Sequence, residues 1–330
     1  MPKAILELLL VLSTGCAART IRVAAHNTQT PTGDGHHVWS YLLLPADAPP
    51  ELPPAPRAVV FYVRGSGYDH SVLGMMGPMA DFVMLGMPVV LLERRGIGPS
   101  ESDPVLARRY ADLSVRAEDA LASMRTHLAR LSPGTPVILA GDSEGGAVAS
   151  RMARAEPRIT HLLLLASGGG MTQAEELALL VRDPTNGYGT PEEFEVAVAD
   201  IRTNPGSDRE WLGHPYRRWS SALWHRSAED LLAAKVPVFL AQGDRDTYVP
   251  VESARRLRDA FEVEGRSDLL RYCEYPGLDH GFEDANGRSG FGLVVRDLVG
   301  WLRGQGLLEE AEASRLLQSM SQISTGSADP

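Results

Sequence analysis

Short, continuous apolar runs alternate along most of the chain with segments of helical periodicity. The apolar runs occupy residues 37–44, 58–63, 88–92, 137–140, 161–166, 236–241 and 269–275. Runs of this length are typical of strands that are buried on both faces of a sheet. Their alternation with helical segments predicts βαβ units and a mostly parallel central sheet, which is an α/β fold.

Two helices are indicated clearly between these strands. Residues 105–131 carry apolar side chains at helical spacing, and Pro133-Gly134 follows them as a stop signal. A second helix is predicted from about Glu144 to Ala155, directly after the strand at 137–140. The proline-rich segment 45–56 predicts a turn between the first two strands.

Residues 171–235 interrupt this alternation. They contain three of the five tryptophans, Trp211, Trp219 and Trp224, together with several turn signals. An insertion at this point of an open α/β sheet lies above the carboxyl edge of the strands, where ligands bind. We therefore interpret the segment as a helical cap, in which the tryptophans either anchor the cap to the core or line the ligand site.

A pentapeptide with the pattern G-x-S-x-G lies between a predicted strand and a predicted helix. Its residues are Gly141-Asp142-Ser143-Glu144-Gly145. A turn this tight imposes strained backbone angles on the serine, and the flanking glycines avoid clashes. The helix that follows places the partial positive charge of its N-terminus beside the serine, where it favours a developing oxyanion. The setting indicates that Ser143 is a nucleophile.

From these features the chain resembles the α/β-hydrolase superfamily over roughly residues 35–305. The resemblance implies an acid after a later strand and a histidine after the last strand. The segment 236–250 resembles the family's strand–Gly-x-x-Asp-x-x-Val-Pro pattern and assigns the acid to Asp246, with Asp244 as the alternative. The segment 275–282 resembles the histidine loop of the family and assigns the base to His280.

The resemblance also implies a role for each residue. His280 would take the proton of Ser143 and return it to the leaving group, while Asp246 would orient the imidazole. The backbone amide of Glu144 would be one donor of an oxyanion hole. The second donor is expected in the loop after residues 58–63, where Ser66 is our choice and Gly65 and Gly67 are alternatives.

Composition excludes several other classes of function. The formal net charge of −10 argues against a non-specific nucleic-acid-binding protein, because affinity for phosphates comes from lysine and arginine. The two cysteines, Cys16 and Cys273, offer neither a disulfide framework nor a CxxC metal site. The glycine-rich segments lack the Lys-Ser/Thr pair of a phosphate loop, so we expect catalysis without metal or cofactor.

The predicted function is therefore hydrolysis of a small-molecule acyl substrate. We expect a carboxylic ester or thioester to be cleaved through an acyl-enzyme on Ser143. An aminopeptidase or prolyl-oligopeptidase-like peptidase on the same fold is the alternative within hydrolases. A non-catalytic binding protein is the alternative from another class, because a fold alone does not establish function.

The N-terminus predicts export. Lys3 is followed by an apolar run over residues 4–12 and by small residues that end in Gly15-Cys16, which resembles a bacterial lipoprotein signal. Residues 1–16 would then be a signal segment, with membrane attachment through a lipid on Cys16. A periplasmic protein without lipid and a cytoplasmic protein with an apolar N-terminus are the alternatives. We expect the hydrolase domain over residues 20–308 and a flexible tail over 309–330.

Labelling with radioactive palmitate tests the lipoprotein prediction. Cells that produce the wild-type chain are expected to incorporate label into it, and the Cys16→Ala variant is expected to remain unlabelled, because Cys16 is the residue that would carry the lipid. An unlabelled wild-type chain would contradict lipidation.

Overall fold

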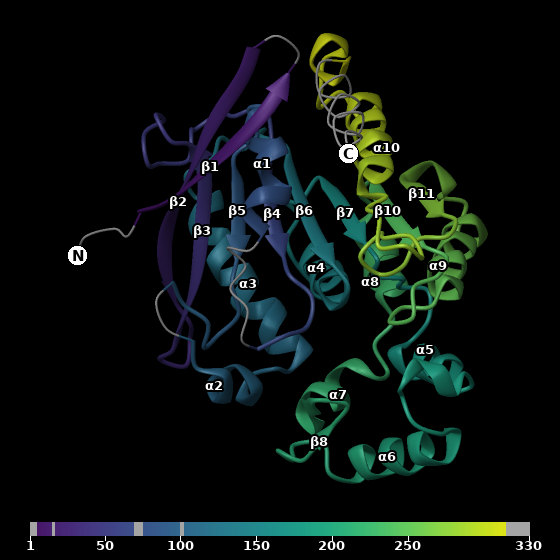
Figure 1. The fold of residues 1–330 in the computed structure, drawn as a ribbon. Coiled ribbons are helices and arrows are strands. Elements are labelled where there is room, and N and C mark those ends of the chain that lie inside the picture. Colours follow the sequence, from purple (N-terminus) through teal and green to yellow (C-terminus); the bar gives the residue numbers. More distant parts are fainter. Residues whose placement is uncertain (1–4, 15–16, 69–74, 100–101, 315–330) are drawn as a thin grey trace.

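The computed structural model describes residues 5–14, 17–68, 75–99 and 102–314. Within these residues the central sheet has nine strands in the order β1-β2-β3-β5-β4-β6-β7-β10-β11 (Figure 1). Their bounds are β1 Ile5–Thr14, β2 Ala17–Pro31, β3 His37–Pro45, β4 Val59–Val63, β5 Val89–Leu92, β6 Val137–Asp142, β7 His161–Leu165, β10 Val238–Gly243 and β11 Leu270–Tyr275. Strands β5, β4, β6, β7, β10 and β11 are parallel, while β1, β2 and β3 pair antiparallel. The predicted mostly parallel sheet is confirmed.

The parallel strands are apolar on both faces because helices cover both sides of the sheet. Every residue of β4 is buried, and its neighbours β5 and β6 are almost as apolar. One face packs against α1 (Met76–Met84) and α10 (Phe291–Gly304). The other face packs against α3 (Leu113–Leu128), α4 (Glu144–Ala155), α8 (Ser227–Ala234) and α9 (Val251–Val263).

The single helix predicted over residues 105–131 is wrong. The structure has two helices there, α2 (Pro104–Arg109) and α3, separated by residues 110–112. The break has a local cause. The carboxylate of Asp112 accepts hydrogen bonds from the amides of Ser114 and Val115 and so starts a new helix. The spacing of apolar residues does not reveal this helix N-cap.

The segment after β7 forms a cap with a small core of its own. Its elements are α5 (Gln173–Leu180), the 3₁₀ turn η2 (Pro184–Asn186), α6 (Pro191–Thr203), β8 (Glu210–Trp211), β9 (His214–Pro215) and α7 (Tyr216–Ala222). They share a cluster of buried side chains that runs from Leu177 to Leu223. In Figure 1 these elements lie below the sheet. The predicted cap range, 171–235, also takes in α8, but Leu231 of α8 belongs to the core against the sheet.

The two ends of the chain extend this frame. Residues 5–14, predicted as part of an export signal, pair with β2 as strand β1, and Cys16 lies outside the described residues. Near the other end Ala313 is buried against the core. The first residues of the range predicted as a flexible tail, 309–330, therefore pack against the domain. In the part of the chain described, none of the helices is both long and apolar enough to span a bilayer.

Candidate active site

Ser143 occupies a sharp turn between β6 and α4. Its backbone angles, φ 50° and ψ −127°, are strained for a residue that carries a side chain. The amide of Ser143 donates a hydrogen bond of 2.9 Å to the carbonyl of Leu165 in the next strand. The turn thus holds the serine at the carboxyl end of the parallel strands, as a nucleophile elbow does.

Three glycines allow this turn to pack against the end of β4. A Cβ atom at Gly145 would lie 2.2 Å from the carbonyl oxygen of Val63, and one at Gly141 would lie 2.4 Å from that of Gly145. A Cβ atom at Gly65 would lie 2.9 Å from the Cβ of Ser143. These approaches exclude any side chain at the three positions.

The histidine and the acid predicted from the sequence meet in the structure. The Nδ1 of His280 lies 2.8 Å from the Oδ2 of Asp246, whose side chain is fully buried. Asp246 also accepts hydrogen bonds from the amides of Tyr248 and Val249 and from the side chain of Gln242. These contacts fix the carboxylate and therefore the ring that it faces.

The two carboxylates nearest in sequence to the predicted acid and base, Asp244 and Asp279, accept hydrogen bonds from backbone amides. Asp244, the alternative acid, accepts a hydrogen bond of 2.6 Å from the amide of Gly277. Asp279, next to the histidine, accepts bonds from the amides of Gly281 and Glu283. Both carboxylates shape the loop that carries His280, and the structure brings Asp246 rather than Asp244 to the imidazole.

The electrostatic setting of His280 suits a general base. Burial lowers the pKa of His280, but the hydrogen bond and charge of Asp246 outweigh burial, so the pKa is raised above its usual value. The carboxylate of Asp142, the residue before Ser143, adds to this rise. The ring of His280 also lies 5.0 Å from that of Tyr248, which lines the same cavity as Ser143.

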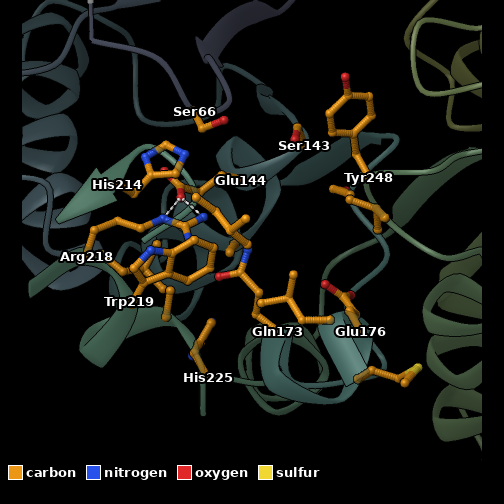
Figure 2. Close-up of a pocket in the computed structure, with 18 of the residues that line it drawn as sticks. Ser66, Ser143, Glu144, Gln173, Glu176, His214, Arg218, Trp219, His225 and Tyr248 are labelled. Carbon is orange, nitrogen blue, oxygen red and sulfur yellow. Dashed lines mark hydrogen bonds and ion pairs between the residues drawn. The ribbon is translucent and has the colours of Figure 1, made fainter. Parts of the chain in front are cut away.

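The two residues predicted to donate to the oxyanion line the same cavity as Ser143. The amide of Glu144 is at the N-terminus of α4, and Ser66 lines the cavity (Figure 2). The amide of Gly65, one of the alternatives, already donates a 3.0 Å hydrogen bond to the carboxylate of Asp142. This bond leaves Ser66 better placed than Gly65 as the second donor.

The side chain of Glu144 is buried between two arginines. Arg116 of α3 and Arg218 of α7 both form ion pairs with its carboxylate. Burial by itself would raise the pKa of Glu144, but Arg218 and Arg116 hold it well below its usual range. The guanidinium of Arg218 also lies 4.0 Å above the ring of Trp219. The residue after the nucleophile therefore connects the cap to the central domain.

A cavity of about 500 Å³ opens between the nucleophile turn and the cap. Ser66, Ser143 and Tyr248 line it from the sheet side, and Trp219 and Glu176 line it from the cap. In Figure 2 the carboxyl group of Glu176 points into this space, on the side opposite Ser66. The volume is within the range of small-molecule sites.

Sequence reasoning missed several residues of this site. Gln242, which holds Asp246, is a polar residue inside the apolar run of β10, and that exception was a readable signal. Glu176, Arg116 and Arg218 carry no comparable local signal, because their partners lie far away in the sequence. Over the described ranges, no group of three or more histidine, cysteine, aspartate or glutamate side chains is arranged to hold a metal ion.

Comparisons with known proteins agree with this geometry. A family model described as serine aminopeptidase, S33, matches residues 54–183. A thermophilic esterase from Thermogutta terrifontis superposes with a TM-score of 0.59 at 17% identity, covering 87% of this chain and 94% of that one. Est1E from Butyrivibrio proteoclasticus, with ferulic acid bound, has a TM-score of 0.53 at 18% identity, covering 77% and 91%. No curated protein matches the chain by sequence.

The sheet, the serine turn and the order Ser143, Asp246, His280 define an α/β-hydrolase fold. The family model over residues 54–183 and the structural neighbours agree with this fold and with a hydrolase. The predicted fold is confirmed.

Glu176 makes stability depend on pH. Burial raises its pKa to about 8, whereas in the unfolded chain it returns to about 4.5. Between these values the unfolded chain releases a proton that the folded chain keeps, so rising pH destabilises the fold by up to about 1.4 kcal/mol per unit. In urea unfolding, Glu176→Gln is therefore expected to gain stability relative to wild type between pH 5 and pH 8.

The neighbouring glutamate provides the control for this prediction. Glu175 lies on the same helix, is partly exposed, pairs with Arg226 and has a lowered pKa. Glu175→Gln is expected to shift stability by an amount that stays constant over the same pH range. A constant difference for Glu176→Gln as well would contradict the buried, protonated state of Glu176.

Proposed function

We propose that this protein is a serine esterase that cleaves carboxylic esters or thioesters with a small or medium acyl group. The observation that carries the proposal is the His280–Asp246 pair, whose imidazole ring lies against Tyr248 of the cavity that Ser143 also lines. A cavity of about 500 Å³ beneath the cap suits an acyl group of that size. The esterases among the structural neighbours support the same reaction class.

The reaction runs in two acyl-transfer steps. His280 accepts the proton of Ser143 as its Oγ attacks the carbonyl carbon, and the amides of Glu144 and Ser66 stabilise the oxyanion that forms. The tetrahedral intermediate collapses to an acyl-serine, and His280 gives the proton to the departing alcohol or thiol. Water then attacks the acyl-serine by the same route and releases the acid. Asp246 stabilises the imidazolium in both steps.

Cleavage of aminoacyl amides is a second candidate, which one observation favours. The buried carboxyl group of Glu176 faces the cavity, and a substrate ammonium group beside it would lower its pKa and favour its ionised form. The family model that matches residues 54–183 is described as a serine aminopeptidase. Hydrolysis of aminoacyl-aminomethylcoumarins that exceeds hydrolysis of p-nitrophenyl esters would favour this candidate over the esterase.

Export and lipidation of Cys16 stay part of the proposal. A lipid on that cysteine would hold the hydrolase at a membrane surface.

Replacing the nucleophile tests the reaction class. The purified wild-type protein is expected to release nitrophenol from short-chain p-nitrophenyl esters and to react with a fluorophosphonate probe at Ser143. Ser143→Ala is expected to lower kcat by roughly 10⁴-fold or more, because no acyl-serine can form. Ser267→Ala, at an exposed serine of the 3₁₀ turn after α9, is expected to keep wild-type activity. Activity that survives Ser143→Ala would refute the assignment.

The pH dependence of the reaction tests the histidine and its acid. His280 works as a base only when neutral, and its raised pKa places the acid limb of kcat/KM at a midpoint above about 6.5. Asp246→Asn removes the charge that raises this pKa, so the midpoint is expected to fall and kcat to drop by roughly 10⁴-fold.

The same substitution two residues away provides the control. Asp244→Asn can still accept the hydrogen bond from the Gly277 amide, and it faces no part of the imidazole, so the midpoint is expected to stay where it is in the wild type. An equal shift in both variants would show that Asp246 has no special relation to His280.

A further inference from the structure

The peptide bond between Gly65 and Ser66 is packed directly against the nucleophile turn. The amide of Gly65 is bound by Asp142, and its Cα leaves no room for a Cβ beside Ser143. A trans peptide is planar, so the carbonyl oxygen of Gly65 and the N–H of Ser66 point in opposite directions. Whatever holds that carbonyl therefore decides where the Ser66 N–H points.

Two guanidinium groups lie close to the carbonyl oxygen of Gly65. The Nη2 of Arg94, which follows β5, donates a short hydrogen bond to the carbonyl oxygen of Gly65. The Nη2 of Arg116 lies 3.5 Å from the same oxygen and donates a 2.8 Å hydrogen bond to the carbonyl of Arg64. The loop after β4 is thus fixed by two charged donors that are not among the residues lining the cavity, whereas Ser66 lines it.

A charged donor on a peptide carbonyl also changes the amide on its other side. Hydrogen bonds to charged groups are roughly twice as strong as those between neutral groups. Through the conjugated peptide, electron density drawn toward the carbonyl makes the N–H a stronger donor, which is the cooperativity of hydrogen-bond chains. The effect increases as negative charge develops in front of the N–H during the reaction.

We propose that Arg94, with Arg116 beside it, is a positioning residue that orients and polarises the Gly65–Ser66 peptide so that the Ser66 amide stabilises the oxyanion. This inference rests on the esterase function proposed above and specifies how one half of its oxyanion hole is built. Arg94 is not among the residues that line the cavity and would act only through the peptide.

The cost of keeping Arg94 in this place supports the proposal. Burial and the neighbouring charge of Arg116 together lower its pKa to about 9, against the carboxylates of Glu144 and Glu93, so the protein holds two like charges close together. At neutral pH the guanidinium remains a cation. Its position behind the oxyanion hole places positive charge where the transition state gains a negative one.

Kinetics of Arg94→Met test the proposal. An oxyanion donor acts mainly in the transition state, so we expect kcat on p-nitrophenyl butyrate to fall by about 10- to 100-fold while KM stays within about twofold. The Ki of a trifluoromethyl ketone, which forms a hemiketal oxyanion on the serine, is expected to rise in parallel. If Arg94 served folding alone, the folded variant would show neither a fall in kcat at nearly constant KM nor a rise in the Ki of the ketone.

Arg108→Met is the matched control. Arg108 stacks on the ring of Tyr68, as Arg94 does, but it pairs with Glu210 rather than with the Gly65 carbonyl. We expect its kcat and its Ki for the ketone to stay within about threefold of wild type. Arg94→Gln keeps a neutral donor at the carbonyl, so its kcat and Ki are expected to lie between those of wild type and Arg94→Met. If Arg94→Met does not fold, the comparison of Arg94→Gln with wild type tests the proposal.

The outcomes separate the inference from the function on which it rests. If the wild type hydrolyses esters and the folded Arg94 variants match it in kcat and Ki, the inference is wrong and the esterase function stands. The inference is also wrong if Arg108→Met loses as much as Arg94→Met. A wild type that neither hydrolyses esters nor reacts with a fluorophosphonate overturns both.

Discussion

The contact between the nucleophile turn and the end of β4 is the constraint on which the site depends. At Gly145 the backbone of one strand-turn-helix unit approaches the carbonyl of Val63 so closely that even a methyl group would overlap it. The carboxylate of Asp142 joins the same two segments by accepting bonds from Tyr62 and Gly65. The Ser143 turn and the loop after β4 are therefore one packed unit, although nearly eighty residues separate them in the sequence.

Ion pairs connect this packed unit to the cap. Glu144 contributes an amide beside the nucleophile, and its side chain pairs with Arg218 of α7 across the edge of the cavity. Breaking a buried ion pair from one side leaves an uncompensated charge, which is costly in a dry environment. The cap is thus held over the cavity by the residue that follows the nucleophile. A single carboxylate thus joins α3 and α7 at the N-terminus of α4.

Local patterns predicted the parts of the structure that local physics determines. The apolar runs located the parallel strands to within about two residues, and the G-x-S-x-G turn was readable because strand, glycine and helix signals coincide around Ser143. Strand β2 was missed, because its threonines, glutamine and asparagine hide its alternation. The helix break at Asp112 was missed because one hydrogen-bonding side chain outweighed the apolar spacing around it.

The rest of the site depends on tertiary contacts that leave little trace in one sequence. Only Lys3 and Lys235 among the 32 basic residues are lysines, so Arg94, Arg116 and Arg218 do not stand out from the many other arginines. The cavity draws Glu176 from α5, Trp219 from α7 and Tyr248 from the loop after β10, and their mutual distances exist only in the folded chain. Acyl-transfer chemistry belongs to short local turns, whereas substrate choice belongs to a surface assembled from many elements. The sequence therefore reveals the reaction class more readily than the substrate.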